Sequence, residues 1–152
     1  MPNNRSFALN RLNGLLRTLK RKPQMKEHYL ECMAKLFERG YTAPIPPNKP
    51  PPRGGRTWYL AHFGVYYPKK PTQIRVVFDS SEKYRGISLN KELIPGPNMM
   101  NSLLRVLFRI CREEVAVMCD VKQIFHSFHV YPEHRNFLRP LWFQDNDPEK
   151  KW

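Results

Sequence analysis

The residues best suited to chemistry end a short apolar run, Val115-Ala-Val-Met-Cys-Asp120, whose composition predicts a buried strand. A carboxylate seldom ends a buried strand without a partner, because an unpaired charge is costly to remove from water. A divalent cation, a helix cap or a salt bridge would each satisfy Asp120. Taken alone, the segment favours capping or ion pairing over catalysis.

Three further sequence blocks precede this one and give Asp120 a context. They are Ile74-Arg-Val-Val-Phe-Asp79, Ser88-Leu-Asn90 and Gly96-Pro-Asn-Met-Met-Asn-Ser-Leu-Leu104, and the fourth block runs from Ala116 to Phe128. Any one block is a weak signal, but the four in this order resemble a reverse transcriptase. More narrowly, residues 5–142 resemble the polymerase of BEL/Pao long-terminal-repeat retrotransposons.

This resemblance implies an α+β fold that forms the front part of a right-hand polymerase. The expected parts are an N-terminal helical pair, a fingers β-hairpin and the start of the palm. The corresponding boundaries are 1–43 for the basic helical pair, 44–57 for a Pro-rich linker, 58–113 for the fingers-like hairpin, loop and helix, and 114–152 for the partial palm.

The resemblance also assigns roles at the start of the palm. In such polymerases two divalent ions, Mg²⁺ or Mn²⁺, align the primer 3′-hydroxyl with the α-phosphate of a dNTP. Asp120 matches the catalytic carboxylate that binds these ions, with the Val121 carbonyl as a second metal ligand. The backbone N–H groups of Gln123 and Ile124 would face the triphosphate. Phe125 matches the aromatic residue beneath the sugar.

In the fingers, Arg75 matches the arginine that clamps the incoming triphosphate, a task that suits a planar, permanently charged fork. Lys69 or Lys70 would supply a companion cation, although a lysine pair at a hairpin tip is usually only solvated. Asp79 would orient Arg75 or contact the template. Asn90 is expected to order the loop that follows the hairpin.

The sequence departs from the family pattern in three respects. Lys122 stands where an acidic or neutral residue is usual, and Ser127-Phe128 replaces the commoner Gln-Val or Gln-Ile. A Tyr-x-Asp-Asp motif, whose first aspartate completes the metal site, does not occur, and Asp145 and Asp147 lie in a polar turn that substitutes for it poorly. We therefore expect this chain by itself to lack polymerase activity.

The elements that must position these residues begin with two helices. Apolar residues recur at helical spacing in residues 5–22 and again in 23–40, which predicts an amphipathic pair. Pro23 suits the first position of the second helix and Gly40 its left-handed end, whereas Gly14 weakens the first helix. The basic face of the first helix is either solvated or binds nucleic acid.

Residues 44–52 contain six prolines, which predicts an extended linker. The aromatic run 58–67 and the alternating run 73–78 predict a β-hairpin that turns at 68–71. Its aromatic side chains either stack on bases or belong to the core. Later elements are expected as a helix after Asn98, a helical turn at 122–128, and strands at 115–120, 129–131 and 137–143.

Composition limits the class of protein. The 152 residues are 41% hydrophobic, enough to bury a core but too few for a large multidomain enzyme. Lys and Arg total 26 against 13 Asp and Glu, and the net charge of +13 predicts a polyanionic partner. The excess lies mostly in residues 1–60, where 12 cations face 3 glutamates.

Cysteine and apolar patterns exclude several other classes. Cys32, Cys111 and Cys119 have no CxxC spacing, which indicates neither a disulfide framework nor a zinc site. His126 and His129 lie three residues apart but lack a third ligand. We find neither a signal peptide nor an apolar transmembrane run, so an intracellular location is expected, with cytoplasm and nucleus both open.

Two functions remain open at this stage. The first is a fragment of a retroelement RNA-directed DNA polymerase, whose partners are RNA or DNA template-primer, dNTP and the remainder of the retroelement polyprotein. The second is a non-enzymatic, basic nucleic-acid-binding protein derived from such an element. Both predict nucleic-acid binding that weakens as salt rises.

Overall fold

The computed structural model describes residues 1–46, 52, 54–112 and 114–150, and much of the predicted linker 44–57 therefore lies outside the described residues. The chain divides into two compact units, Met1–Leu93 with Val130–Trp152, and Ile94–His129. The described residues form four α-helices and a three-stranded sheet, an α+β fold. None of these helices is long and apolar enough to cross a membrane.

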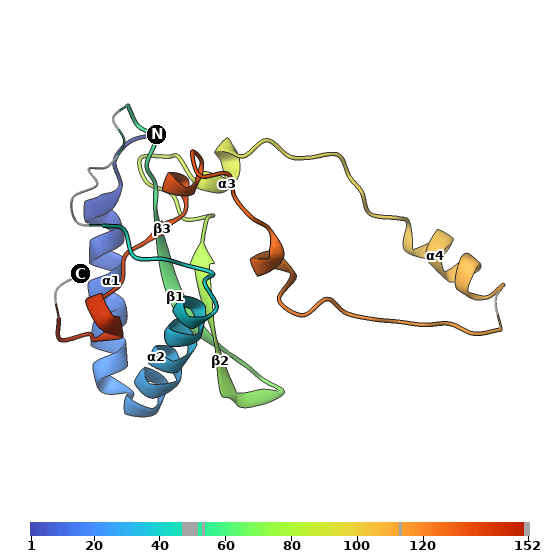
Figure 1. Cartoon of the computed structure of the whole chain (residues 1–152), viewed down its shortest axis with the longest axis horizontal. Helices are drawn as coiled ribbons and strands as arrows, with labels where there is room; N and C mark the ends of the chain where they lie inside the picture. Colours follow the sequence, from blue (N-terminus) through green and yellow to red (C-terminus); the bar gives the residue numbers. More distant parts are fainter. Residues whose placement is uncertain (47–51, 53, 113, 151–152) are drawn as a thin grey trace. The chain divides into compact units, whose positions relative to one another are not determined.

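The predicted helical pair is confirmed. Helix α1 spans Arg5–Arg21 and helix α2 spans Pro23–Glu38, with Pro23 in its first turn (Figure 1). Gly40 has a φ of +68°, the left-handed conformation expected after the second helix. Gly14 does not interrupt α1.

The predicted β-hairpin is also confirmed. Strand β1 (Tyr59–Tyr67) pairs antiparallel with β2 (Lys70–Asp79), and the register changes between Tyr66 and Tyr67. A two-residue strand, β3 (Arg139–Pro140), pairs in parallel with the start of β1, so the sheet order is β2-β1-β3. The strand expected at 137–143 is thus reduced to two residues, and residues 129–131 form no strand.

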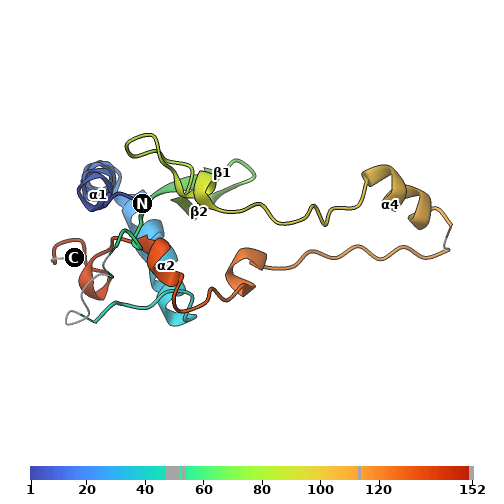
Figure 2. The same cartoon turned by 90° about the horizontal axis from the view of Figure 1, so that it is seen from above.

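The main core of the first unit lies between the helical pair and the sheet. Helix α1 packs against β1, and α2 packs against β2. Figure 2 shows both helices beside the hairpin. Apolar side chains from both helices, from β2 and from the C-terminal segment fill this space: Leu12, Leu15, Leu19, Tyr29, Met33, Ile74 and Phe143.

Gly64 in β1 allows α2 to approach the sheet closely. A Cβ atom at this position would lie 2.5 Å from Cδ1 of Ile74 and 3.0 Å from Cδ2 of Tyr29. Because Tyr29 is completely buried, its ring has little room to move. The absence of a side chain at residue 64 is therefore a packing requirement.

Asn4 joins the beginning of α1 to β1. It is 2% exposed, and its side-chain amide donates to the Tyr59 carbonyl while its oxygen accepts from the Tyr59 N–H, both at 2.8 Å. Asn4 makes no side-chain bond to its own helix. It thus satisfies two backbone groups of the strand instead of capping α1.

The second unit contains α4 (Leu103–Ile110) and a 3-10 turn at Ile124–Ser127. Helix α4 begins five residues after Asn98, later than expected. The predicted strand at 115–120 is wrong, because no described residue pairs with this segment and Val117 and Met118 are 88% and 94% exposed. A strand needs a neighbour to satisfy its backbone groups, and this segment has none among the described residues.

The two glycines provide a matched stability test. Gly64→Ala is expected to lower the free energy of unfolding by about 1–3 kcal/mol through overpacking. Gly14→Ala is expected to raise it by about 0.5–1 kcal/mol, because alanine favours helix and nothing lies within 4 Å of the added Cβ. Urea unfolding of the full chain measures both changes. Equal effects of the two substitutions would contradict the packing role of Gly64.

Candidate nucleotide-binding and nucleic-acid-binding residues

Arg75 lies in the middle of β2, opposite Val65 of β1. Alternation along the strand buries the neighbouring Ile74 in the core and leaves Arg75 exposed on the other face. Its guanidinium carbon is 5.2 Å from the centroid of the Tyr67 ring, within range of a cation–π contact. The Tyr67 ring therefore packs against the guanidinium of Arg75, which stays exposed to solvent.

Lys69 lies in the turn between the two strands and is exposed. Lys70 is the first residue of β2 and is paired with Tyr67, but its side chain lies outside the described residues. The hairpin thus carries Arg75 on its face and Lys69 at its tip, an arrangement that suits an anionic ligand.

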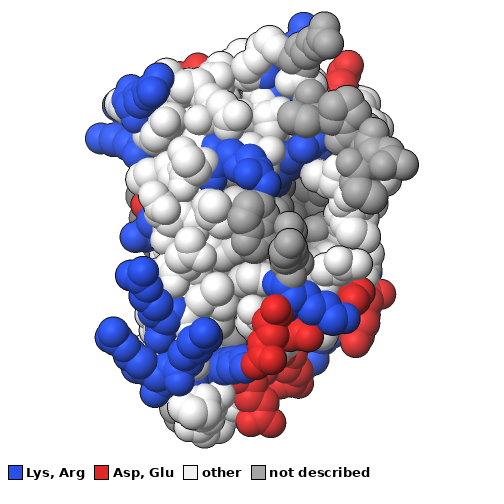
Figure 3. All heavy atoms as spheres, turned by 90° about the vertical axis from the view of Figure 1, so that its left-hand side faces the viewer, with Lys and Arg blue, Asp and Glu red and all other residues white. Residues whose placement is uncertain are grey.

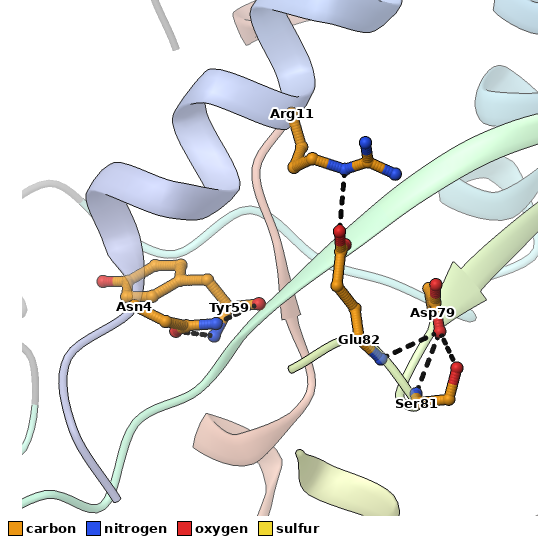
Figure 4. Close-up of polar contacts among 6 residues, drawn as sticks. All are labelled: Asn4, Arg11, Tyr59, Asp79, Ser81 and Glu82. Carbon is orange, nitrogen blue, oxygen red and sulfur yellow. Dashed lines mark hydrogen bonds and ion pairs between the residues drawn. The ribbon is translucent and has the colours of Figure 1, made fainter. Parts of the chain in front are cut away.

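Asp79 serves the loop after β2. Its Oδ1 accepts hydrogen bonds from the N–H and hydroxyl of Ser81, at 2.9 and 2.6 Å, and from the N–H of Glu82 at 3.2 Å (Figure 4). Arg75 lies four residues earlier, about 13 Å along the strand. Asp79 therefore orders its own turn rather than orienting Arg75.

The loop after β2 is joined to α1 by an ion pair and to Asn90 by two hydrogen bonds. The carboxylate of Glu82 pairs with Arg11 at 2.9 Å, as Figure 4 shows. The Ser80 hydroxyl donates to the Asn90 side chain at 2.6 Å, and the Asn90 N–H donates to the Ser80 carbonyl at 2.9 Å. This structural role of Asn90 matches the prediction.

The remaining candidate residues belong to the second unit. Asp120, Val121, Gln123, Ile124 and Phe125 are all exposed, and Phe125 is 87% exposed. The backbone turns sharply at Gln123, whose φ is +56°, before the 3-10 turn begins. These five residues are neighbours in the sequence and lie in the turn at 120–125 of the second unit. Arg75 and Lys69 lie in the first unit.

The oxygen donors of this turn are the right kind for Mg²⁺ or Mn²⁺ but too few to hold an ion. The Asp120 carboxylate and the Val121 carbonyl supply hard oxygen ligands. Across the described residues, however, no three His, Cys, Asp or Glu side chains gather closely enough to form a metal site. The donor set among the described residues therefore does not fit a two-ion centre.

Comparison of the chain with protein-family models, with curated proteins and with solved structures finds no match. The assignment of roles to Arg75 and Asp120 consequently depends on the sequence blocks and on local geometry.

A buried polar cluster centred on His62 was not predicted. Nε2 of His62 lies 2.9 Å from the Leu141 carbonyl and must donate to it, so Nδ1 accepts the Tyr29 hydroxyl at 2.5 Å. The ring of Trp142 packs on both Tyr29 and His62. A histidine in an apolar, aromatic strand is the only sequence signal that pointed to this cluster.

Burial in this cluster perturbs both titratable groups. Desolvation raises the pKa of Tyr29 and lowers the pKa of His62, although the hydrogen bond to Leu141 partly opposes the change at His62. The cluster also anchors the C-terminal segment, where the Trp142 indole donates to Asn146 and Asn146 donates to the Leu30 carbonyl. Neutral His62 thus links α2, β1 and the returning chain.

The lowered pKa of His62 predicts an acid-sensitive fold. The unfolded state binds this proton more readily than the folded state, so the free energy of unfolding is highest above pH 6.5 and falls as the pH drops below it. One such group gives a slope of up to about 1.4 kcal/mol per pH unit. Urea unfolding from pH 8 to pH 5 measures this slope.

Two variants separate His62 from the other histidines. His62→Gln is expected to be less stable at pH 8 but to lose most of the slope. His134→Gln replaces an exposed histidine and should keep the slope. An unchanged slope in His62→Gln would show that other groups cause the acid sensitivity.

Proposed function

We propose that this chain is the fingers and early palm of a retroelement reverse transcriptase, an RNA-directed DNA polymerase that transfers a nucleotide from dNTP to a primer 3′-hydroxyl. The proposal is supported chiefly by four sequence blocks in polymerase order, of which the first forms β2 with Arg75 exposed on its face. The net charge of +13 agrees with a nucleic-acid template-primer as partner.

Each candidate residue has a defined task in this proposal. Arg75 binds the triphosphate through its planar fork, and Lys69 adds a second positive charge. Asp120 and Val121 contribute oxygen ligands to Mg²⁺ or Mn²⁺, together with carboxylates from the rest of the retroelement polyprotein. Because the donor set among the described residues is incomplete and the sequence contains no Tyr-x-Asp-Asp motif, the chain by itself is not expected to incorporate nucleotides.

The direct test is incorporation of labelled dNTP on a primed RNA template by the chain extended with its in-frame downstream sequence. Asp120→Asn is expected to reduce incorporation by more than about a hundredfold, because even the residues that only orient metal ligands cost 10–100-fold when replaced. Incorporation at the wild-type rate by Asp120→Asn would overturn the assignment.

Asp145→Asn is the matched control, because it makes the same change at an exposed carboxylate that pairs only with Lys150 among the described residues. It should leave incorporation unchanged. If Asp145→Asn abolishes incorporation and Asp120→Asn does not, the turn at residues 144–147 supplies the catalytic carboxylate.

A second pair of variants tests the triphosphate clamp. Arg75→Gln is expected to raise the KM for dNTP by about 10–100-fold, since a hydrogen bond to a charged group contributes about 1.5–3 kcal/mol. Arg85→Gln is the control, because Arg85 also stacks on a tyrosine, with 5.4 Å between its guanidinium carbon and the Tyr84 ring centroid. Equal changes in KM for the two variants would contradict a specific role for Arg75.

One structural observation favours the alternative, a non-enzymatic nucleic-acid-binding protein. The two core clusters of the first unit contain no residue of 94–129, so its basic surface does not depend on the segment that carries Asp120. In this alternative the chain binds RNA or DNA, and Asp120→Asn changes no measured property of the extended product.

A further inference from the structure

The positive charge of the helical pair comes from α1. This helix contains five cations, Arg5, Arg11, Arg17, Lys20 and Arg21, and no acidic residue. In α2, by contrast, two lysines face three glutamates. Part of the α1 charge has a structural use, because cations in the last turn favourably meet the negative end of the helix dipole.

Helical geometry directs α1's polar residues away from the core. Ala8, Leu12, Leu15 and Leu19 are buried against the sheet side of the helix. Residues roughly opposite them, at 100° per residue, are all exposed, and they form what we call the outer stripe: Ser6, Asn10, Asn13, Arg17, Lys20 and Arg21. The stripe therefore presents amides, a hydroxyl and cations to solvent.

The two arginines of the stripe lie near the C-terminal end of α1, about one helical turn apart. Arg17 and Arg21 are separated by about 6 Å along the helix axis. Neither forms an ion pair with a residue that the structure describes. Lys20 lies at the border of the stripe, since it lines a cavity of about 330 Å³ with Glu149.

Acidic and basic side chains are unevenly distributed on the face of the molecule that Figure 3 shows, although some cations adjoin the acidic group. In Figure 3, Lys and Arg gather along one lower edge of the face, and Asp and Glu gather at the other. The C-terminal segment places one acid beside cations, because Glu149 lines a cavity with Lys20 and Lys26. The Glu149 carboxylate repels a polyanion from Lys20 and so favours contact through Arg17 and Arg21.

The chemistry of the outer stripe selects among polyanionic partners. Membrane-surface helices insert an apolar face, but the apolar face of α1 is already buried. Protein interfaces have an aromatic or apolar centre, and no large hydrophobic residue of α1 is exposed. Amide, hydroxyl and guanidinium groups without apolar neighbours are typical contacts to a nucleic-acid backbone.

We propose that the outer stripe of α1 is a binding surface for the phosphate backbone of RNA or DNA, separate from the hairpin that carries Arg75. Arg17 and Arg21 contact phosphates, while Asn10 and Asn13 donate to backbone oxygens along the same line. The inference rests on the proposed function in one respect, that the physiological partner is nucleic acid.

The test is the salt dependence of binding of the full chain to fluorescein-labelled single-stranded RNA, between about 50 and 200 mM salt. Arg17→Gln/Arg21→Gln is expected to reduce the slope of log K against log salt by about 1.4, because each lost phosphate contact on a single strand contributes about 0.7. Affinity at the lowest salt should fall about tenfold or more.

Two control variants fix the interpretation. Lys35→Gln/Lys91→Gln removes the same charge elsewhere and should leave the slope nearly unchanged, and Arg17→Lys/Arg21→Lys should preserve it. Far-UV circular dichroism establishes that each variant is folded. An equal loss of slope in the Lys35/Lys91 variant, or none in Arg17→Gln/Arg21→Gln, would overturn the proposal.

Three further outcomes separate this inference from its alternatives. Loss of binding to phosphatidylserine vesicles with unchanged RNA binding in Arg17→Gln/Arg21→Gln would overturn the proposal in favour of a lipid surface. An unchanged slope in that variant, together with lost incorporation in Asp120→Asn, would overturn the α1 surface and leave the polymerase assignment standing. A reduced slope in Arg17→Gln/Arg21→Gln, together with normal incorporation in Asp120→Asn, would support the α1 surface and overturn the polymerase assignment.

Discussion

The close approach of α2 to β1 at Gly64 is the constraint on which the first unit depends. It places the Tyr29 ring in the core and its hydroxyl against His62, whose other nitrogen reaches the Leu141 carbonyl. One buried tyrosine thus connects a helix, a strand and the C-terminal segment. Without that segment the edge of β1 that pairs with β3 would lose its partner.

The chain on either side of residues 94–129 packs into a second core cluster of the first unit. Before them, Leu89 packs with Trp58 and Leu60, and after them Phe137 joins the same cluster. The segment that carries Asp120 therefore lies in the sequence between two residues of one core cluster. Its exposed apolar residues include Met118 and Phe125, and in the proposed function further palm strands would cover such side chains and bury their apolar surface.

The cationic side chains proposed to bind anions, Arg75 and those of the outer stripe, lie outside these packing contacts. Arg75 extends from the open face of the hairpin, and the outer stripe lies on the side of α1 opposite its buried leucines. Substitutions at either place should change anion binding much more than they change the fold, because neither surface contributes side chains to the core.

Local patterns were sufficient to predict α1, α2 and the hairpin, but not the short helix α3 (Leu89–Glu92), which lies where a loop was expected. The leucine spacing of residues 5–22 and the alternation of 73–78 each bury one face, which determines the element. Contacts between residues that are far apart in the sequence could not be predicted from local patterns. Asn4 pairs with Tyr59, 55 residues away, only because the tertiary fold brings them together. The strand expected at 115–120 did not form because a strand depends on neighbours as well as on composition.

The candidate site was predictable only in part. Alternation along β2 correctly implies that Arg75 and Ile74 face opposite sides, and the sequence blocks name Asp120. The local role of Asp79 was missed, because a carboxylate after a strand caps its own turn as readily as it serves an arginine. The polymerase roles of Arg75 and Asp120 stay predictions.

The most direct measurement is the sequence of the genomic locus and transcript beyond the codon for Trp152. The polymerase proposal predicts an open reading frame that encodes a Tyr-x-Asp-Asp motif between two palm strands, which would supply the missing carboxylates. A stop codon at that point in both genome and transcript would contradict it and leave nucleic-acid binding as the function to study.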